Sequence, residues 1–211
     1  MKKIKFSCPV ILSNIKNHEY LNEKLLKYFS TCEGESVGGG NGYKIKGDTF
    51  PDSFKKLDFH LCNDYERPWV KFFLPHLKKE LKEIANSLWY DDFSFKGIWF
   101  QQYEHYDTHG WHIHANNYTG VYYVDMGKDS PKTEIIDPYN NKNITVINVE
   151  SGSLLLFPSF FIHRSPPLLK KTEKTIVSFN LNLTKPSNDL FEKKRISYNI
   201  LNKIKKIWKK L

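Results

Sequence analysis

The first third of the chain has the hydrophobic spacing of amphipathic helices. In residues 17–31, apolar side chains recur every three or four residues, which predicts a helix. The side chains are those of Tyr20, Leu21, Leu25, Leu26 and Phe29. Residues 65–88 repeat the pattern around Pro75, so we predict a second helix that is broken near this proline. A short apolar run at residues 6–12 predicts a strand before the first helix.

After residue 92 the pattern changes to short runs of strand-forming residues. Turn-forming residues such as Gly127, Pro138 and Gly152 separate them. The runs span residues 95–103, 120–124, 133–136, 144–149, 153–157 and 175–183. Short strands at such regular intervals are typical of an all-β sandwich or barrel rather than of a parallel sheet. A last apolar stripe, from Leu190 to Leu211, predicts a closing amphipathic helix.

These elements predict a single domain of the α+β class, in which helices flank a mostly β core. A length of 211 residues suits one domain. We assign residues 1–92 to an N-terminal helical and loop region that supports the core, 93–186 to the β core, and 187–211 to a basic amphipathic helix. Hydrophobic residues make up 40% of the chain, which excludes an intrinsically disordered protein.

The net charge of +9 is concentrated at the C-terminus. Residues 188–211 contain eight lysines and arginines, and their acidic residues are Asp189 and Glu192, so this segment carries +6. A basic helix can bind nucleic acid or another acidic partner, but the same composition is typical of a solvated helix face, which we favour. The helix fits against its own barrel or against a second copy, so the oligomeric state stays open.

No segment has the pattern of a membrane span or a secretory signal. The longest apolar run, residues 154–162, has nine residues and is interrupted by Pro158. The apolar residues 8–12 are too few for a signal peptide. The three cysteines are well separated and form no disulfide framework. We therefore predict a cytoplasmic protein without a membrane partner.

Histidines gather after residue 104, where five of the eight lie. His112 and His114 are two residues apart, so on a strand their side chains point to the same face and can reach one ion. His163 can complete the site from a distant strand. Nitrogen-rich sets of this kind suit iron, copper, nickel or zinc. The alternative is a set of structural histidines that bind no metal, and we expect His109 to be a loop residue without a role.

Four motifs resemble, in the same order, those of the 2-oxoglutarate/Fe(II) oxygenases related to the prolyl hydroxylases. Residues 112–124 (HIHANNYTGVYYV) are similar to the signature HxHPNSxxSGVYYL. The family's f-DP, G-x-L-x-x-FPS…H and RISISFN motifs resemble residues 136–138 (IDP), 152–159 (GSLLLFPS, followed by His163) and 174–180 (KTIVSFN). The resemblance implies a double-stranded β-helix, or jelly-roll, that binds Fe(II).

The resemblance also implies the metal ligands. Carried over by position, His112 is the first ligand and His163 the distal one, while His114 stands where most active relatives have Asp or Glu. A neutral imidazole at this place leaves the site one negative charge short. A competing ligand set starts from the literal HxD formed by His105 and Asp107, although its spacing to the GVYY strand fits the family less well.

Three further residues are implied in binding the cosubstrate. Tyr103 resembles a tyrosine that lines the 2-oxoglutarate pocket, Tyr123 one that binds the far carboxylate, and Lys174 the basic residue that pairs with it. Arginine is usual in the last place, so a point charge replaces a bidentate fork. The alternative roles are those of two core tyrosines and a surface lysine. Trp99 or Phe100, but not both, can face the pocket, because neighbours on a strand point to opposite faces.

The resemblance implies an Fe(II)- and 2-oxoglutarate-dependent dioxygenase. Such an enzyme hydroxylates a peptidyl or small-molecule substrate with O2 and releases succinate and CO2. One alternative is a cupin-type three-histidine metalloprotein that does not use 2-oxoglutarate, although the Glu that cupins place after HxH is absent from residues 115–118. The other is a non-enzymatic jelly-roll that serves as a binding module.

Overall fold

The structure is a computed structural model that describes residues 4, 8–37, 52–136 and 143–191. The Asp-Pro motif at residues 137–138 and most of the predicted basic helix, from residue 192 onward, lie outside the described residues. Nucleic acid as a partner of that helix therefore stays a prediction. Among the helices that are described, none combines the length and the apolar character needed to cross a membrane.

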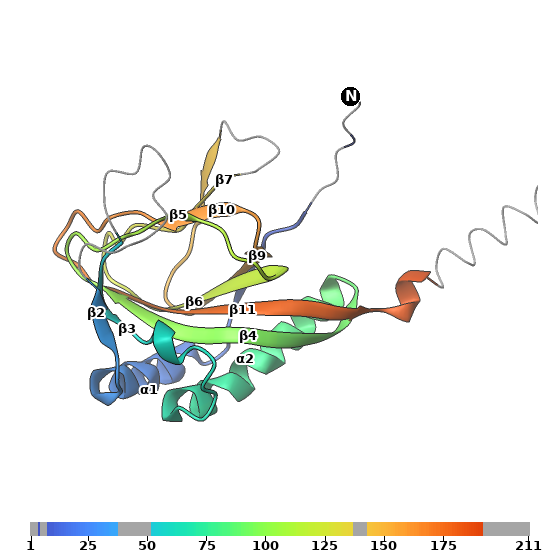
Figure 1. The fold of residues 1–211 in the computed structure, drawn as a ribbon, viewed down its shortest axis with the longest axis horizontal. Coiled ribbons are helices and arrows are strands. Elements are labelled where there is room, and N and C mark those ends of the chain that lie inside the picture. Colours follow the sequence, from blue (N-terminus) through green and yellow to red (C-terminus); the bar gives the residue numbers. More distant parts are fainter. Residues whose placement is uncertain (1–3, 5–7, 38–51, 137–142, 192–211) are drawn as a thin grey trace, which may run out of the picture.

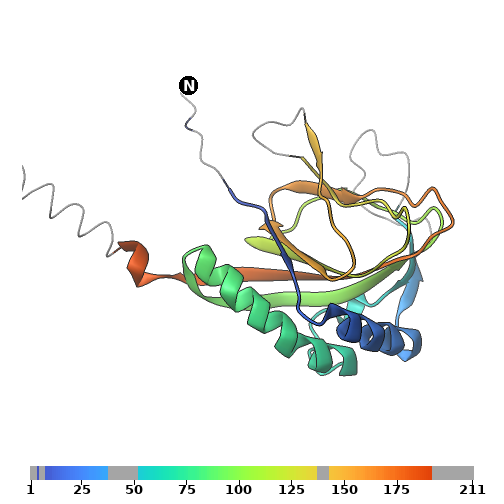
Figure 2. The same cartoon turned by 180° about the vertical axis from the view of Figure 1, so that it is seen from behind.

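The described strands form two antiparallel sheets that face each other (Figures 1 and 2). In order across the larger sheet they are β1 (Ile11–Asn14), β9 (Ser153–Pro158), β6 (Tyr118–Met126), β11 (Lys174–Pro186), β4 (Tyr90–Tyr103), β3 (Phe54–Leu57) and β2 (Glu35–Val37). The smaller sheet has the order β5 (His109–His112), β10 (Ile162–Ser165), β7 (Glu134–Ile136) and β8 (Ile144–Val146). The predicted class, a mostly β core with flanking helices, is confirmed.

Two helices, α1 (His18–Thr31) and α2 (Pro68–Ser87), cover the face of the larger sheet that points away from the smaller one (Figure 2). The predicted break at Pro75 is wrong, because α2 runs through this residue. A proline inside a helix removes one main-chain hydrogen bond and costs about 3 kcal/mol. Pro75 itself is exposed, whereas a continuous stripe from Trp69 to Ala85 is buried on the sheet. Burial of several such side chains, at about 1.5–3 kcal/mol each, outweighs that cost.

The long central strands β4 and β11 supply both faces of the larger sheet. Alternate residues point in opposite directions, so Phe100 packs in the core under the helices while Trp99 faces the smaller sheet. The pairing of the two strands places Lys174 opposite Tyr103 and Ser178 opposite Trp99. The side chains that face the smaller sheet therefore form rows across β4 and β11, and these rows make one wall of the pocket described below.

A buried carboxylate fixes the middle of β4 to the start of α2. Asp58 accepts hydrogen bonds from the Phe100 N–H at 2.8 Å and from Trp69 Nε1 at 3.0 Å, and it pairs with the Arg67 guanidinium. Arg67 also donates to the carbonyl oxygen of Ile98 at 2.6 Å. Burial raises the pKa of Asp58, and Arg67 opposes this. The network holds β4 in place beside Trp99.

Candidate metal centre

The first two histidines of the centre come from adjacent strands of the smaller sheet. His112 is the last residue of β5, and His163 lies directly opposite it on β10. The two residues are far apart in the sequence, and the pairing of β5 with β10 brings them together. The rings have centroids 4.2 Å apart, and Phe157 packs edge-on against His163 at 4.6 Å.

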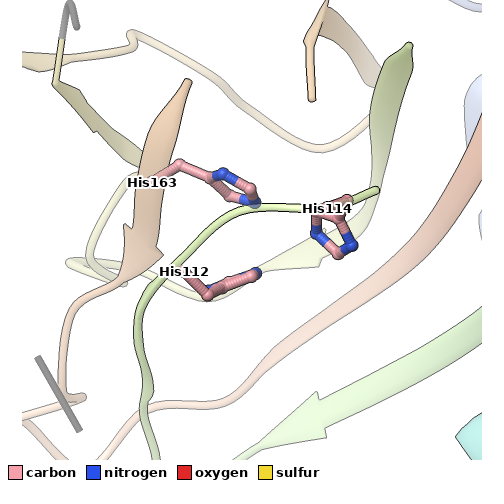
Figure 3. A group of neighbouring side chains, drawn as sticks. All are labelled: His112, His114 and His163. Atoms are coloured by element: carbon pink, nitrogen blue, oxygen red, sulfur yellow. The ribbon is translucent and has the colours of Figure 1, made fainter. Parts of the chain in front are cut away.

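The third histidine is not on a strand, which corrects the reasoning from the HxH spacing. His114 lies two residues beyond the end of β5, and its N–H donates to the Ser159 carbonyl oxygen at 3.0 Å. The hydrogen bond to Ser159 turns the chain so that the ring still faces the other two (Figure 3). Its centroid is 5.0 Å from that of His112 and 5.2 Å from that of His163.

Together the three rings form a geometry suited to one metal ion. Each offers a nitrogen, and these nitrogens lie within 4.8 Å of one another. His112 Nδ1 lies 2.7 Å from the Gly110 carbonyl oxygen, and His163 Nδ1 lies 2.9 Å from that of Phe161. A carbonyl oxygen can only accept a hydrogen bond, so each Nδ1 carries the hydrogen and each Nε2 keeps its lone pair. The backbone therefore selects the tautomer that can bind a metal through Nε2.

Burial keeps all three rings neutral. It lowers the pKa of His112 and His163, and it lowers the pKa of His114 to about 3. Metal ions bind the neutral imidazole, so no proton has to be displaced near neutral pH. The donor set of three neutral nitrogens fits a divalent transition metal.

Lys174 is buried beside this centre without a carboxylate partner among the described residues. It is 1% exposed, and its Nζ donates to Ser165 Oγ and, at 3.4 Å, to the Pro131 carbonyl oxygen. The ammonium also lies 4.7 Å from the ring centroid of Tyr103. Burial lowers the pKa of Lys174 to about 7. A buried amine in such a place favours an anion that would restore its charge.

Tyr103 and Tyr123 belong to one buried hydrophobic cluster, and Lys174 lies against the ring of Tyr103. The buried Tyr103 hydroxyl makes no hydrogen bond within the described part of the chain, although an interaction with Ser165 partly opposes the rise of its pKa. The Tyr123 hydroxyl is hydrogen-bonded to Thr133 Oγ1 at 2.5 Å. Burial raises the pKa of both tyrosines. A buried hydroxyl without a partner needs an explanation, and a ligand oxygen would satisfy that of Tyr103.

A pocket between the sheets joins the histidines to these groups. Its walls comprise Trp99, Gln101, Tyr103, His109, His112, His114, Thr119, Val121, Thr133, His163, Arg164, Ser165, Ile176 and Ser178. Trp99 thus faces the pocket and Phe100 does not, as strand alternation requires. Lys174 and Tyr123 are not on the wall, but they contact Ser165 and Thr133, which are.

The structure places His109 and Asp107 differently from the expectations. His109 is not a loop residue: it begins β5, lines the pocket and stacks on His112 with centroids 3.8 Å apart. The strand signal of HGWH was too short to find from the sequence. Asp107 is buried outside the histidine group, where its carboxylate accepts from Ser53 Oγ and, at 2.9 Å, from the Glu104 N–H.

Comparisons with known proteins show the fold. No family model and no curated sequence matches the chain. Among solved structures, a 2OG-Fe(II) oxygenase family oxidoreductase from Burkholderia pseudomallei is similar, with a TM-score of 0.63 and 10% identity over 85% of this chain and 87% of that one. HygX from Streptomyces hygroscopicus, with nickel and 2-oxoglutarate bound, has a TM-score of 0.58 and 8% identity over 84% of each chain.

A third similar structure is a prolyl hydroxylase from Trichoplax adhaerens in complex with a peptide fragment of hypoxia inducible factor. Its TM-score is 0.54, with 14% identity over 81% of this chain and 83% of that one. Identities this low establish a shared fold and no more. The chain has the double-stranded β-helix fold of the 2-oxoglutarate/Fe(II) oxygenases, the fold that the sequence motifs implied.

Proposed function

We propose that the protein is an Fe(II)- and 2-oxoglutarate-dependent dioxygenase that hydroxylates a peptidyl or small-molecule substrate. The observation that carries the proposal is that two groups of side chains meet at one pocket. The histidines and Tyr103 lie on its wall, and Lys174 contacts the wall residue Ser165. Three neutral histidines converge at one place, and a buried lysine lies against the ring of Tyr103. Among the described residues, the lysine has no carboxylate partner, and the buried hydroxyl of Tyr103 makes no hydrogen bond. The first group fits a divalent metal, and the second fits the carboxylate of an acidic ligand.

In this proposal His112, His114 and His163 hold the iron, and Lys174 with Tyr103 binds the far carboxylate of 2-oxoglutarate. Tyr123 supports the same end of the pocket through Thr133. Iron and 2-oxoglutarate, when bound, supply the activation of O2, with succinate, CO2 and a hydroxylated substrate as products. The chain contributes binding, orientation and the exclusion of water.

The described side chains perform these tasks in distinct ways. The Lys174 ammonium neutralises the carboxylate as a point charge, so the Tyr103 hydroxyl has to supply the direction that an arginine fork would give. Trp99, Val121 and Ile176 form apolar wall and keep bulk water from the site. Gln101 is fixed by the Ser178 hydroxyl, which donates to its Oε1 at 2.8 Å. The amide nitrogen of Gln101 therefore points towards His109.

The proposed substrate class rests on the similar solved structures. The prolyl hydroxylase neighbour was solved with a peptide, which supports a peptidyl substrate here. A small molecule is the alternative, and identification of the oxidised product distinguishes the two.

Anaerobic titration with Fe(II) and 2-oxoglutarate tests the proposal. Chelation of the metal by the keto acid gives a weak visible charge-transfer band, which we expect for the wild type and not when 2-oxoglutarate is omitted. In air, incubation with a cell extract should then yield succinate and an oxidised product, both detectable by mass spectrometry. His76→Ala, which changes an exposed histidine on α2, is the matched control and should behave as the wild type.

Two outcomes would contradict the proposal. Metal uptake without the band at saturating 2-oxoglutarate would favour the cupin-type alternative, whose three histidines need no cosubstrate. A folded protein that takes up no metal would favour the binding module.

A further inference from the structure

A carboxylate that the proposed reaction does not use contacts two residues of β5, the strand that carries His112. Asp52 precedes β3 in the chain, and its Oδ1 accepts a hydrogen bond from the Gly110 N–H at 2.7 Å. Its Oδ2 lies 3.9 Å from His109 Nε2. The two side chains are 21% and 23% exposed, so solvent screens this carboxylate only in part.

Gly110 connects Asp52 to a proposed ligand. The carbonyl oxygen of this glycine is the acceptor for His112 Nδ1, at 2.7 Å. One main-chain group of Gly110 is therefore held by the Asp52 carboxylate, and the other orients the His112 ring. In many metal sites a carboxylate bonds directly to the ligand histidine. In this chain the main chain of Gly110 lies between the Asp52 carboxylate and His112.

His109 makes the second connection. Its ring stacks on that of His112 with centroids 3.8 Å apart and planes inclined by 20°. Gln101 Nε2 lies 3.4 Å from His109 Nδ1, and an amide N–H can only donate, so Nδ1 accepts. With Nδ1 accepting, Nε2 is the ring nitrogen that faces the Asp52 carboxylate. Both nitrogens of His109 thus face neighbours, and its ring acts as a spacer between Asp52 and His112.

The three-histidine set lacks a negative charge that Asp52 can supply from nearby. Three histidines contribute no negative charge, whereas a set with Asp or Glu would contribute one. Two nearby carboxylates are otherwise engaged, since Glu134 pairs with Arg164 at 2.7 Å and Asp107 is bonded to Ser53 and the Glu104 N–H.

We propose that Asp52 is a positioning residue of the metal centre, which orients His112 through Gly110 and His109 and supplies the negative charge that the three-histidine set lacks. The inference rests on the proposed function only for the presence of a metal on these histidines. It assigns Asp52 no contact with the metal, the cosubstrate or the substrate.

Metal binding by three Asp52 variants tests the inference, with Co(II) alone as the probe, measured by calorimetry and by the visible spectrum of the bound ion. Asp52→Asn keeps an oxygen for the Gly110 N–H but removes the charge, and we expect about tenfold weaker binding. Asp52→Ala removes both, and the loss should approach about a hundredfold. Asp52→Glu keeps the charge and should recover most of the affinity.

The matched control is Asp129→Asn, which removes an exposed carboxylate that pairs with Lys170 at 2.9 Å. It should bind Co(II) as the wild type does. Each metal-free variant is checked by thermal unfolding, and if Asp52→Ala does not fold, Asp52→Asn carries the test. A stabilising role confined to the fold would lower the unfolding temperature and leave the Co(II) spectrum unchanged.

Asp52→Asn with wild-type Co(II) affinity and spectrum would overturn the inference and leave the proposed function intact. Conversely, a wild type that binds Co(II) but no 2-oxoglutarate would end the proposed function, and weaker binding by Asp52→Asn would still support the role of Asp52. A wild type that binds no Co(II) would overturn both.

Discussion

The two faces of the larger sheet differ in kind although the same strands build them. Towards the helices, β4 and β11 present Phe100, Val177 and Phe179 to an apolar core. Towards the smaller sheet, they present Gln101, Lys174 and other polar groups, buried next to the histidines. Apolar burial stabilises the fold, whereas burial of a lysine or a neutral histidine costs free energy unless it gains a partner. The apolar face therefore stabilises the sheet, and this stability allows the other face to keep polar groups buried at a cost in free energy.

The largest effect we expect is on the pocket face. His163→Ala should abolish metal uptake, because it removes one of three nitrogens that converge on the site. The metal-free variant should be destabilised by about 1–3 kcal/mol, since it leaves the Phe161 carbonyl without this partner and removes the ring contact with Phe157. Metal content after loading and dialysis measures the first effect, and denaturant titration the second. Full metal content in this variant would dismiss the ligand assignment.

The opposite result is expected on the helix face. Phe100 is fully buried and stacks on Phe29 with centroids 4.3 Å apart. Phe100→Ala should lower the free energy of unfolding by about 3–5 kcal/mol through the cavity that it leaves. Phe100→Leu is the control and should cost much less. The variant that remains folded should bind metal with nearly wild-type affinity. A large loss of metal affinity without a loss of stability would show that the two faces are not separate in function.

The smallest effect concerns the pH dependence of cosubstrate binding. Burial lowers the pKa of Lys174 to about 7, and a bound carboxylate would raise it again. Affinity for 2-oxoglutarate should therefore be full below about pH 7 and fall about tenfold per pH unit above it, until the pH reaches the pKa of the complex. Lys174→Arg stays charged and should show a flat profile in the same calorimetric titration. Equal profiles for the wild type and Lys174→Met would exclude Lys174 as the carboxylate partner.

The same buried lysine should make the stability of the metal-free protein depend on pH. The pKa of Lys174 in the folded protein is lower than the ordinary value for lysine, so between about pH 7 and 10.5 the unfolded chain binds more protons. The free energy of unfolding should then rise with pH across this window. Below the window it carries the full cost of burying the charged lysine. Lys174→Met should remove that contribution to the slope. If the contribution of Lys174, taken as the difference between the wild type and Lys174→Met, falls with pH over this window, the pKa of Lys174 is not lowered in the folded protein.

Long elements with many regularly spaced residues were accessible to prediction from the sequence. The apolar stripe of α1 and the strand patterns in β4 and β11 each extend over more than two turns or several alternations, so local composition determines them. The break predicted at Pro75 was wrong because packing on the sheet outweighs a local penalty. The strands β5 and β10 were not among the predicted runs, and only the histidine spacing suggested strands there, since four residues give too few alternations to be distinguished from a loop.

The sequence by itself determined the identity of the groups that can do chemistry: three histidines, a lysine and two tyrosines at positions that resemble a family pattern. Only the tertiary structure decided how they meet. The pairing of β10 with β5 sets His163 opposite His112, the Ser159 carbonyl turns His114 towards them, and the Gly110 N–H brings in Asp52. The physical reason is range. Side-chain spacing reports only on neighbours along the chain, while these contacts form when distant strands pair and exclude water.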